Sequence, residues 1–337
     1  MSRGDGVVFS GDLHEGERVR VLASLDRLQW PGEVAAARVG RLAGGASNHN
    51  YLLESPSGTW VLRVAAPDAA RFAIDRSRGI TAHRIVAEAG IAPMLVAVQL
   101  PSGDCLTPFI PGTVVDETAV REEATLRSCV RLLRRAHAIP RAGLGELGPF
   151  RASADIAQYA RTARREGLRL PPDIDEFLAA SLMVDPGDMP FGPRLTHNDV
   201  QLANFLIDGH RRAWLLDWEY AGAGNVYFDL AMLASNADMA PDECEGLLAE
   251  YFGPDVRPVD RVRLRAMVFL SALREAMWSV VAGVVMTDTG WDYDAWAERF
   301  FAKVRAELTE LGPQGLAAHA RHEPDDERVA RLLYAVD

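Results

Sequence analysis

The chain has 337 residues, of which 48% are hydrophobic and 25% are charged, a balance that is typical of a folded globular protein and excludes a largely disordered one. No run approaches the roughly 20 apolar residues of a membrane span, and residues 1–20 lack the apolar segment of a secretion signal, so we expect a cytoplasmic protein without membrane insertion. The 47 acidic residues exceed the 36 basic ones, and the resulting net charge of −11 argues against nucleic acid as a partner and favours a cationic or metal-bound small ligand.

The first third of the chain is predicted to form a small antiparallel sheet with two helices. Apolar residues that recur at helical spacing predict a helix over residues 18–29, which "WPG" ends. The pattern then changes to short runs separated by Gly, Ser and Pro, which is typical of strands. We expect strands over 34–42, 50–54 and 59–65, a helix over 75–89, and a hairpin formed by 94–100 and 105–110.

The remainder is predicted to be mainly helical. "PFIPG" at 108–112 is a stiff break, so we place a domain boundary near Gly112, between an N-terminal lobe (1–112) and a C-terminal lobe (113–337). One apolar helix face contains Leu126, Cys129, Val130, Leu133 and His137. Later helices are expected near 227–235, 241–252, 260–285, 293–311 and 323–335. A cleft between two such lobes is a common place for a ligand.

The stretch "LTHNDVQLANFLI" at 195–207 sets His197, Asp199 and Asn204 among apolar residues. Buried polar groups must be bonded, because each unpaired one costs on the order of 1–3 kcal/mol. "NFLI" and "AWLLD" read as a hairpin, which would bring Asn204 and Asp217 together at its open end. An amide oxygen and a carboxylate suit Mg²⁺, and an aspartate nearby suits the base that accepts a hydroxyl proton in phosphoryl transfer.

Simpler explanations exist for each residue taken alone. A single Asp199 or Asn204 in a loop more often caps a turn, and His197 is better explained by a structural hydrogen bond. The combination with Asp217 favours a catalytic site.

"LTHNDVQLANFLI" together with "LLDWEYAGAGNVYFDLAML" resembles the aminoglycoside phosphotransferase and choline kinase superfamily, most closely its bacterial choline/ethanolamine kinase-like branch. The similarity runs roughly from Val39 to Leu308. It implies an α+β, protein-kinase-like fold with a small N-terminal antiparallel sheet lobe and a larger helical lobe, and it implies ATP and Mg²⁺ as cofactors. In this resemblance Asp199 is the catalytic base, and Asn204 and Asp217 hold Mg²⁺.

The resemblance also implies a nucleotide-binding loop in "AGGASNHNYLL". Gly44 and Gly45 would allow close backbone approach, and Ser47 and Asn48 would donate to phosphate. Taken alone, this loop is more often a plain hairpin turn.

One cation and one glycine stand out beside this loop. Arg63 occupies the position where many kinases carry lysine, and its fork can bind phosphate oxygens. Gly79 departs from the family pattern, because an acidic residue usually stands there and pairs with that cation. Either Arg63 lacks this partner, or another carboxylate such as Glu88 replaces it.

The expected substrate pocket combines acids with aromatic rings, the surfaces that bind quaternary ammonium groups. Glu219 is favoured as a ligand because its repulsion with Asp217 must be offset by a cation. For Trp278, ligand contact and core packing are equally good explanations. The predicted substrate-binding residues are Glu219, Tyr220, Glu275, Trp278 and Trp291.

Three functions follow as hypotheses. The leading one is an ATP-dependent kinase for the hydroxyl group of choline, ethanolamine or a related amino alcohol. The second is a kinase of the same fold for an aminoglycoside, thiamine or another hydroxylated metabolite. The third is a non-catalytic ligand-binding protein, which Gly79 motivates. The exact alcohol is left open, and so is the oligomeric state, with a homodimer as one alternative.

Overall fold

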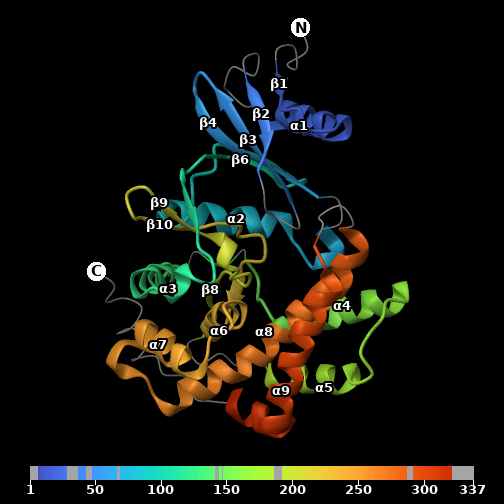
Figure 1. The fold of residues 1–337 in the computed structure, drawn as a ribbon, viewed down its shortest axis with the longest axis vertical. Helices are drawn as coiled ribbons and strands as arrows, with labels where there is room; N and C mark the ends of the chain where they lie inside the picture. Colours follow the sequence, from blue (N-terminus) through green and yellow to red (C-terminus); the bar gives the residue numbers. More distant parts are fainter. Residues whose placement is uncertain are drawn as a thin grey trace.

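The computed structural model describes residues 7–28, 37–42, 48–66, 69–140, 144–145, 147–185, 192–286 and 291–320. They form a smaller part that carries the sheet and a larger part that is mainly helical, stacked along the long axis of the molecule (Figure 1). This arrangement confirms the predicted α+β fold, with a small N-terminal sheet and a larger helical part.

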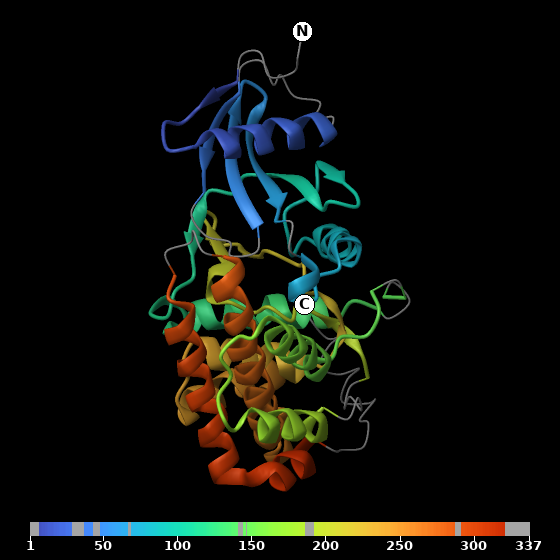
Figure 2. The same ribbon diagram turned by 90° about the vertical axis from the view of Figure 1, so that its right-hand side faces the viewer.

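The smaller part is a six-stranded sheet in the order β1-β2-β3-β4-β6-β5, in which β1 runs parallel to β2 and the other neighbours are antiparallel. Alternate residues of β3, such as Tyr51 and Leu53, are buried, as expected for a sheet with one covered face. That cover includes α1 (Glu15–Leu28), which crosses the sheet in Figure 2 and buries Val21 and Leu25. The strands are β1 (Val8–Phe9), β2 (Arg38–Arg41), β3 (Asn48–Ser55), β4 (Gly58–Ala65), β5 (Ala97–Gln99) and β6 (Asp104–Pro108).

Helix α2 (Arg76–Glu88) lies between the two parts. Asp75 caps it by accepting a hydrogen bond from the Arg78 backbone at 3.1 Å. Its Ala82 and Val86 side chains join the core of the larger part and not that of the sheet. Packing therefore groups α2 with the helical part, although the predicted boundary near Gly112 assigns it to the N-terminal lobe.

The chain enters the larger part at β7 (Gly112–Val114), which pairs with β9 (Phe205–Asp208). A Cβ atom at Gly112 would lie 2.5 Å from the Ile207 carbonyl oxygen, so only glycine fits there. The break predicted at "PFIPG" is thus the point where the chain changes sheets.

The predicted helices of the larger part are present, and the helix expected over 323–335 lies outside the described residues. Helix α8 (Pro258–Val285) is long and apolar enough to cross a membrane by length and composition, but 67% of its apolar window is buried inside the protein, as in a core helix. The other helices are α3 (Glu123–His137), α4 (Ala152–Glu166), α5 (Ile174–Val184), α6 (Val226–Asn236), α7 (Pro241–Phe252) and α9 (Tyr293–Ala320), and the remaining strands are β8 (Arg194–Thr196), β10 (Ala213–Leu215) and β11 (Gly222–Gly224).

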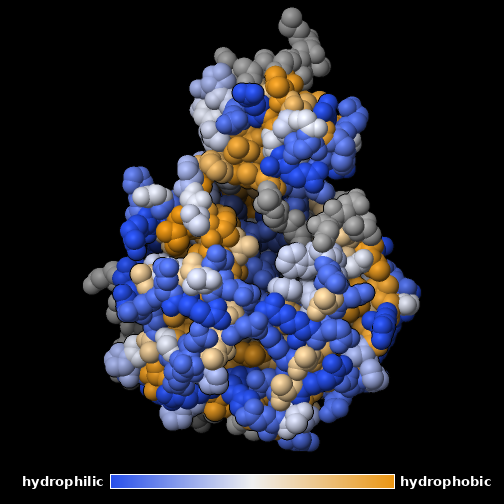
Figure 3. All heavy atoms as spheres, viewed as in Figure 1, coloured by the Kyte–Doolittle hydropathy of each residue, from blue (hydrophilic) through white to orange (hydrophobic). Residues whose placement is uncertain are grey.

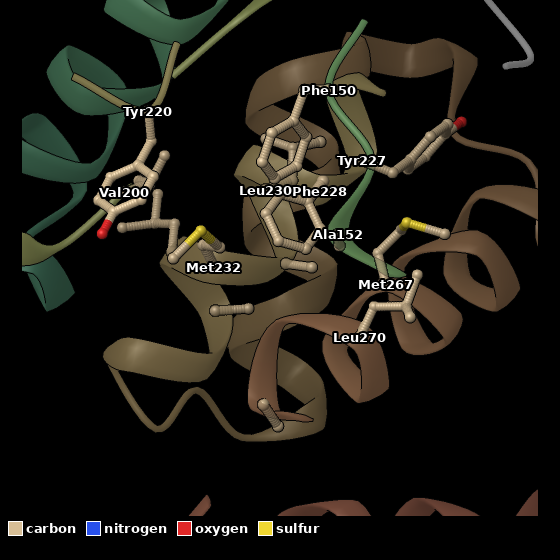
Figure 4. Close-up of a cluster of buried hydrophobic side chains, with 14 of the residues drawn as sticks. Phe150, Ala152, Val200, Tyr220, Tyr227, Phe228, Leu230, Met232, Met267 and Leu270 are labelled. Carbon is tan, nitrogen blue, oxygen red and sulfur yellow. The ribbon is translucent and has the colours of Figure 1, made fainter. Parts of the chain in front are cut away.

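The core of the larger part supports the loops that carry the predicted site residues. Figure 4 shows Val200 and Tyr220 beside Met232 of α6. Val200 directly follows Asp199, and Tyr220 directly follows Glu219. Burial of these two neighbours therefore fixes where both loops can lie.

Candidate active site

The hairpin formed by β9 and β10 brings Asn204 and Asp217 to one end, as predicted. Leu215 pairs with Phe205, and the Leu216 N–H donates to the Asn204 carbonyl oxygen at 2.8 Å. The Asn204 side-chain amide donates to the Asp199 carbonyl oxygen at 2.9 Å. One short hairpin thus joins two loops, which we name the catalytic loop (residues 197–204) and the metal loop (residues 216–221) after the roles predicted for Asp199 and Asp217.

A buried carboxylate on α6 organises the catalytic loop. Asp229 has no exposed surface and accepts hydrogen bonds from the backbones of His197 and Asn198, each at 2.8 Å, and from His137 Nε2 at 2.9 Å. Asp229 is not among the residues predicted for the site from the sequence. The available signal was a carboxylate inside the apolar run "YFDLAML", which has to be paired when buried.

His197 has the structural role expected of it. Its Nδ1 accepts from the Asp199 N–H at 3.2 Å, so Nε2 carries the proton and donates to the Leu216 carbonyl oxygen at 2.7 Å. Burial lowers the pKa of His197, which keeps the ring neutral. The imidazole therefore bridges the catalytic and metal loops.

Asp199 lies among other carboxylates. Burial raises its pKa well above the ordinary value, and the charges of Glu275, Asp217 and Glu219 raise it further, while Arg274 opposes them. Negative charge is therefore in excess around the proposed base, and added positive charge would stabilise its ionised form.

The donors at the hairpin end fit Mg²⁺. Asp217 offers carboxylate oxygens, and the amide oxygen of Asn204 is available because its nitrogen is bonded to Asp199. Burial and the charge of Glu219 raise the pKa of Asp217 to about 6, an effect that a divalent cation would reverse. Among the described residues no three His, Cys, Asp or Glu side chains form a closed metal cage, so water and phosphate oxygens would complete the shell.

Arg63 on β4 reaches down to the metal loop. Its Nη1 lies 3.0 Å from Asp217 Oδ1. Glu88 is exposed in the last turn of α2, roughly 13 Å along the helix from Gly79, so the suggestion that Glu88 replaces the missing acidic partner is wrong. The carboxylate that binds Arg63 is the predicted metal ligand itself.

Two residues that the sequence predicts to contact ligands are instead bonded to other side chains of the protein. Asn48, the first residue of β3, donates to Glu219 Oε2 at 2.9 Å and accepts from Arg76 Nη1 at 2.8 Å. Arg76 Nη1 also lies 2.6 Å from Glu219 Oε2. The repulsion between Glu219 and Asp217 is thus offset by a cation of the protein. Asn48 was predicted to bind phosphate and Glu219 to bind substrate, but in the structure both side chains belong to this buried network. Gly44, Gly45 and Ser47 lie outside the described residues.

The other predicted substrate residues form a wall beside the catalytic loop. Gln201 donates to Glu275 Oε2 at 3.0 Å, and Trp278 Nε1 donates to the Tyr220 hydroxyl at 3.2 Å. Trp278 is only partly buried, whereas Tyr220 is 4% exposed. The structure therefore brings Tyr220, Glu275 and Trp278 together, with Tyr220 behind Trp278.

Trp291 stands at the outer edge of this wall. It is 55% exposed and packs edge-on against Trp296, with ring centroids 5.2 Å apart, and Trp296 in turn donates a hydrogen bond to Glu275. Gln201 and Trp296 were not among the predicted site residues. Figure 3 shows the surface hollowed between the two parts of the molecule, with hydrophilic residues on its floor.

The buried Arg274 packs against the residues of this wall from the protein interior. The Arg274 guanidinium lies 4.5 Å from the centre of the Tyr220 ring, and its Nε donates to Asp155 Oδ2 at 3.0 Å. Its Nη1 is 3.8 Å from Glu275 Oε1. Arg274 could not be predicted from local sequence, because its partner Asp155 lies 119 residues away.

Comparison with known proteins places these features in a family. The pattern of the phosphotransferase enzyme family matches residues 38–264. Protein LicA of Haemophilus influenzae is 24% identical over 212 residues, which are 62% of this chain and 61% of that protein, so the chain spans less than two thirds of the relative's length. A choline/ethanolamine kinase family protein from Mesorhizobium loti has a similar fold, with a TM-score of 0.70 at 21% identity, over 90% of this chain and 99% of that one. LicA in complex with AMP gives a TM-score of 0.63 at 18% identity, over 80% and 93% of the two chains.

Proposed function

Because this chain belongs to the phosphotransferase enzyme family, we propose that it is a kinase that transfers a phosphoryl group from ATP to the hydroxyl group of a cationic amino alcohol such as choline or ethanolamine. The observation that carries the proposal is the set of groups around Asp199. Its backbone carbonyl accepts from the Asn204 side chain at 2.9 Å, and the charges of both Asp217 and Glu275 act on its carboxylate. A cytoplasmic location, where ATP is available, is part of the proposal.

In this reaction the acceptor oxygen attacks the γ-phosphorus while the bond between that phosphorus and the ADP oxygen breaks. Asp199 accepts the proton that the hydroxyl group loses. Its raised pKa makes it a stronger base once it is ionised, and the positive charge of the bound ligands favours ionisation. Arg63 can release Asp217 and bind phosphate oxygens with its fork.

Asp217 and Asn204 would hold Mg²⁺, which would neutralise charge on the transferred phosphoryl group. His197 and Asp229 contribute by fixing the backbone of Asp199, since a base must stay within hydrogen-bond reach of the proton it accepts.

The cationic acceptor is supported by the charge of the wall. Asp217 and Glu219 each have an arginine at 3.0 Å or less, whereas the arginine nearest to Glu275 is 3.8 Å away and is bonded to Asp155 at 3.0 Å. An ammonium group at the partly exposed Trp278, about one helical turn from the buried Glu275, would offset this charge. We therefore expect the substrate's positive end there and its hydroxyl group at Asp199.

The test is ATP consumption by the purified protein with Mg²⁺ and each of choline, ethanolamine, thiamine and an aminoglycoside panel, with Asp199→Ala as the control. Turnover with an amino alcohol that Asp199→Ala abolishes, while ATP still binds, is the expected result. Turnover with thiamine or an aminoglycoside alone would replace the proposed acceptor by the second hypothesis. ATP binding without turnover on any acceptor would favour the non-catalytic hypothesis, and normal turnover by Asp199→Ala would refute the base.

A further inference from the structure

A buried network joins three elements that are far apart in the chain. Arg76 on α2 is 8% exposed, Glu219 on the metal loop is 1% exposed, and Asn48 on β3 is 3% exposed. Arg76 Nη1 lies 2.6 Å from Glu219 and 2.8 Å from Asn48, and Asn48 donates to Glu219 at 2.9 Å. Each pair of the three is bonded, so displacement of one element disturbs both others.

Gly79 lets α2 approach the metal loop closely enough for this network to form. A Cβ atom at position 79 would lie 2.9 Å from the Glu219 Cα, 3.3 Å from its carbonyl oxygen and 3.4 Å from that of Trp218. These neighbours are backbone atoms, which cannot rotate away as a side chain can. Any larger residue at 79 therefore pushes the helix and the loop apart.

The network also distributes the charges of the metal loop. Glu219 is two residues from Asp217, and each carboxylate has its own arginine, Arg76 for the first and Arg63 for the second. Without Arg76, the buried Glu219 would lose the arginine that lies 2.6 Å from it, and the charges of Asp217 and Glu219 would both act on Arg63.

We propose that Arg76 is a positioning residue for nucleotide binding. Its bonds to Glu219 and Asn48, together with the close approach at Gly79, hold the metal loop in place beside β3 and α2. Because Arg76 pairs with Glu219, Arg63 is left to bind Asp217 and the phosphates. The family pattern predicts an acidic residue at position 79, on the helix, that pairs with Arg63. In this chain the helix instead carries a cation, Arg76, about one turn earlier, which pairs with Glu219 of the metal loop. This proposal rests on the kinase function proposed above.

The test is calorimetric binding of ATP in the presence of Mg²⁺, which needs no acceptor. Gly79→Ala and Arg76→Met are expected to raise the Kd for ATP on the order of tenfold, and Arg76→Lys, which keeps the charge but not the fork, to raise it less. Gly246→Ala is the control for a helical glycine, because nothing lies within 4 Å of its added Cβ. Arg27→Met is the control for an ion pair, because its 2.7 Å contact with Asp104 stays within the smaller part.

The double variant Arg76→Met/Glu219→Gln separates position from charge, because it removes the carboxylate together with the arginine that pairs with it and keeps a side-chain oxygen that can accept from Asn48. We expect its ATP binding to stay weakened. In Arg76→Lys and Gly79→Ala we expect the KM for the acceptor to stay within about twofold, since Glu275 and Trp278 lie on α8 and outside the metal loop.

If the double variant bound ATP as tightly as the wild type, the net charge alone would explain the effect of Arg76, and its positioning role would be refuted. Wild-type affinity in Gly79→Ala and Arg76→Lys, both folded by circular dichroism, would also overturn the proposal, and so would equal losses in the two controls. If the wild-type protein itself bound no ATP, the kinase function would fail and this proposal with it, whereas a wrong choice of acceptor would leave these binding results unchanged.

Discussion

Replacement of Asp229 by asparagine tests how the catalytic loop is held. The Oδ1 atom of Asp229 accepts from the Asn198 N–H at 2.8 Å, and Oδ2 accepts from the His197 N–H at 2.8 Å and from His137 Nε2 at 2.9 Å. An asparagine has one oxygen for these two places, so its NH₂ group must face at least one donor.

The better orientation keeps the oxygen at the Oδ2 place and leaves the Asn198 N–H unpaired. One buried unpaired donor costs about 1–3 kcal/mol, so we expect the Asp229→Asn variant to lose that much free energy of unfolding. The kcat should fall at least tenfold, because Asn198 precedes Asp199 and a displacement of about 1 Å at a catalytic group can cost on the order of 10²-fold.

Urea unfolding and steady-state kinetics measure the two effects. Asp208→Asn is the matched control, because Asp208 also accepts three hydrogen bonds, from the backbones of His210 and Arg212 and from Trp214 Nε1, but lies at the partly exposed hairpin turn where water can replace them. We expect the control to lose less than about 1 kcal/mol. An Asp229→Asn variant with the stability and kcat of the wild type would refute the assigned role.

Three further predictions concern pH and the acceptor. Since the charge of Glu275 raises the pKa of Asp199, Glu275→Gln should lower that pKa and move the acid limb of the pH profile of kcat/KM to lower pH; an unmoved limb would contradict the coupling. Burial lowers the pKa of His83 from 6.5 to about 4, so the unfolded state binds protons more tightly and stability is lost as the pH falls below 6.5. From pH 7.5 to 5 the loss should be about 2 kcal/mol by urea unfolding, and a His83→Gln variant that kept the full loss would exclude this histidine as its source. Trp278→Phe keeps an aromatic face but loses the donor to the Tyr220 hydroxyl, so it should raise the KM for choline more than that for ATP; equal changes in both would indicate a packing role.

The parts of the site that depend on local geometry could be predicted from the sequence. Asn204 and Asp217 flank one short hairpin, and the pairing of two adjacent strands is enough to bring them together. Asp199 lies five residues before Asn204, so its place beside the pair follows from the same hairpin. The structural role of His197 was also predictable, because a buried imidazole in an apolar run needs hydrogen bonds.

The pairing of the buried charges depends on the tertiary structure. Arg76 and Glu219 are 143 residues apart, and His137 and Asp229 are 92 apart, so no spacing rule joins them. The sequence therefore predicts a substrate cation beside Glu219, whereas the fold supplies Arg76 as its partner. At position 79 the sequence indicates only a missing carboxylate, whereas the structure shows that the absence of a side chain lets α2 approach the metal loop. The physical reason is that hydrophobic periodicity and turn chemistry act over a few residues, whereas the partner of a buried charge depends on which elements the core packs together.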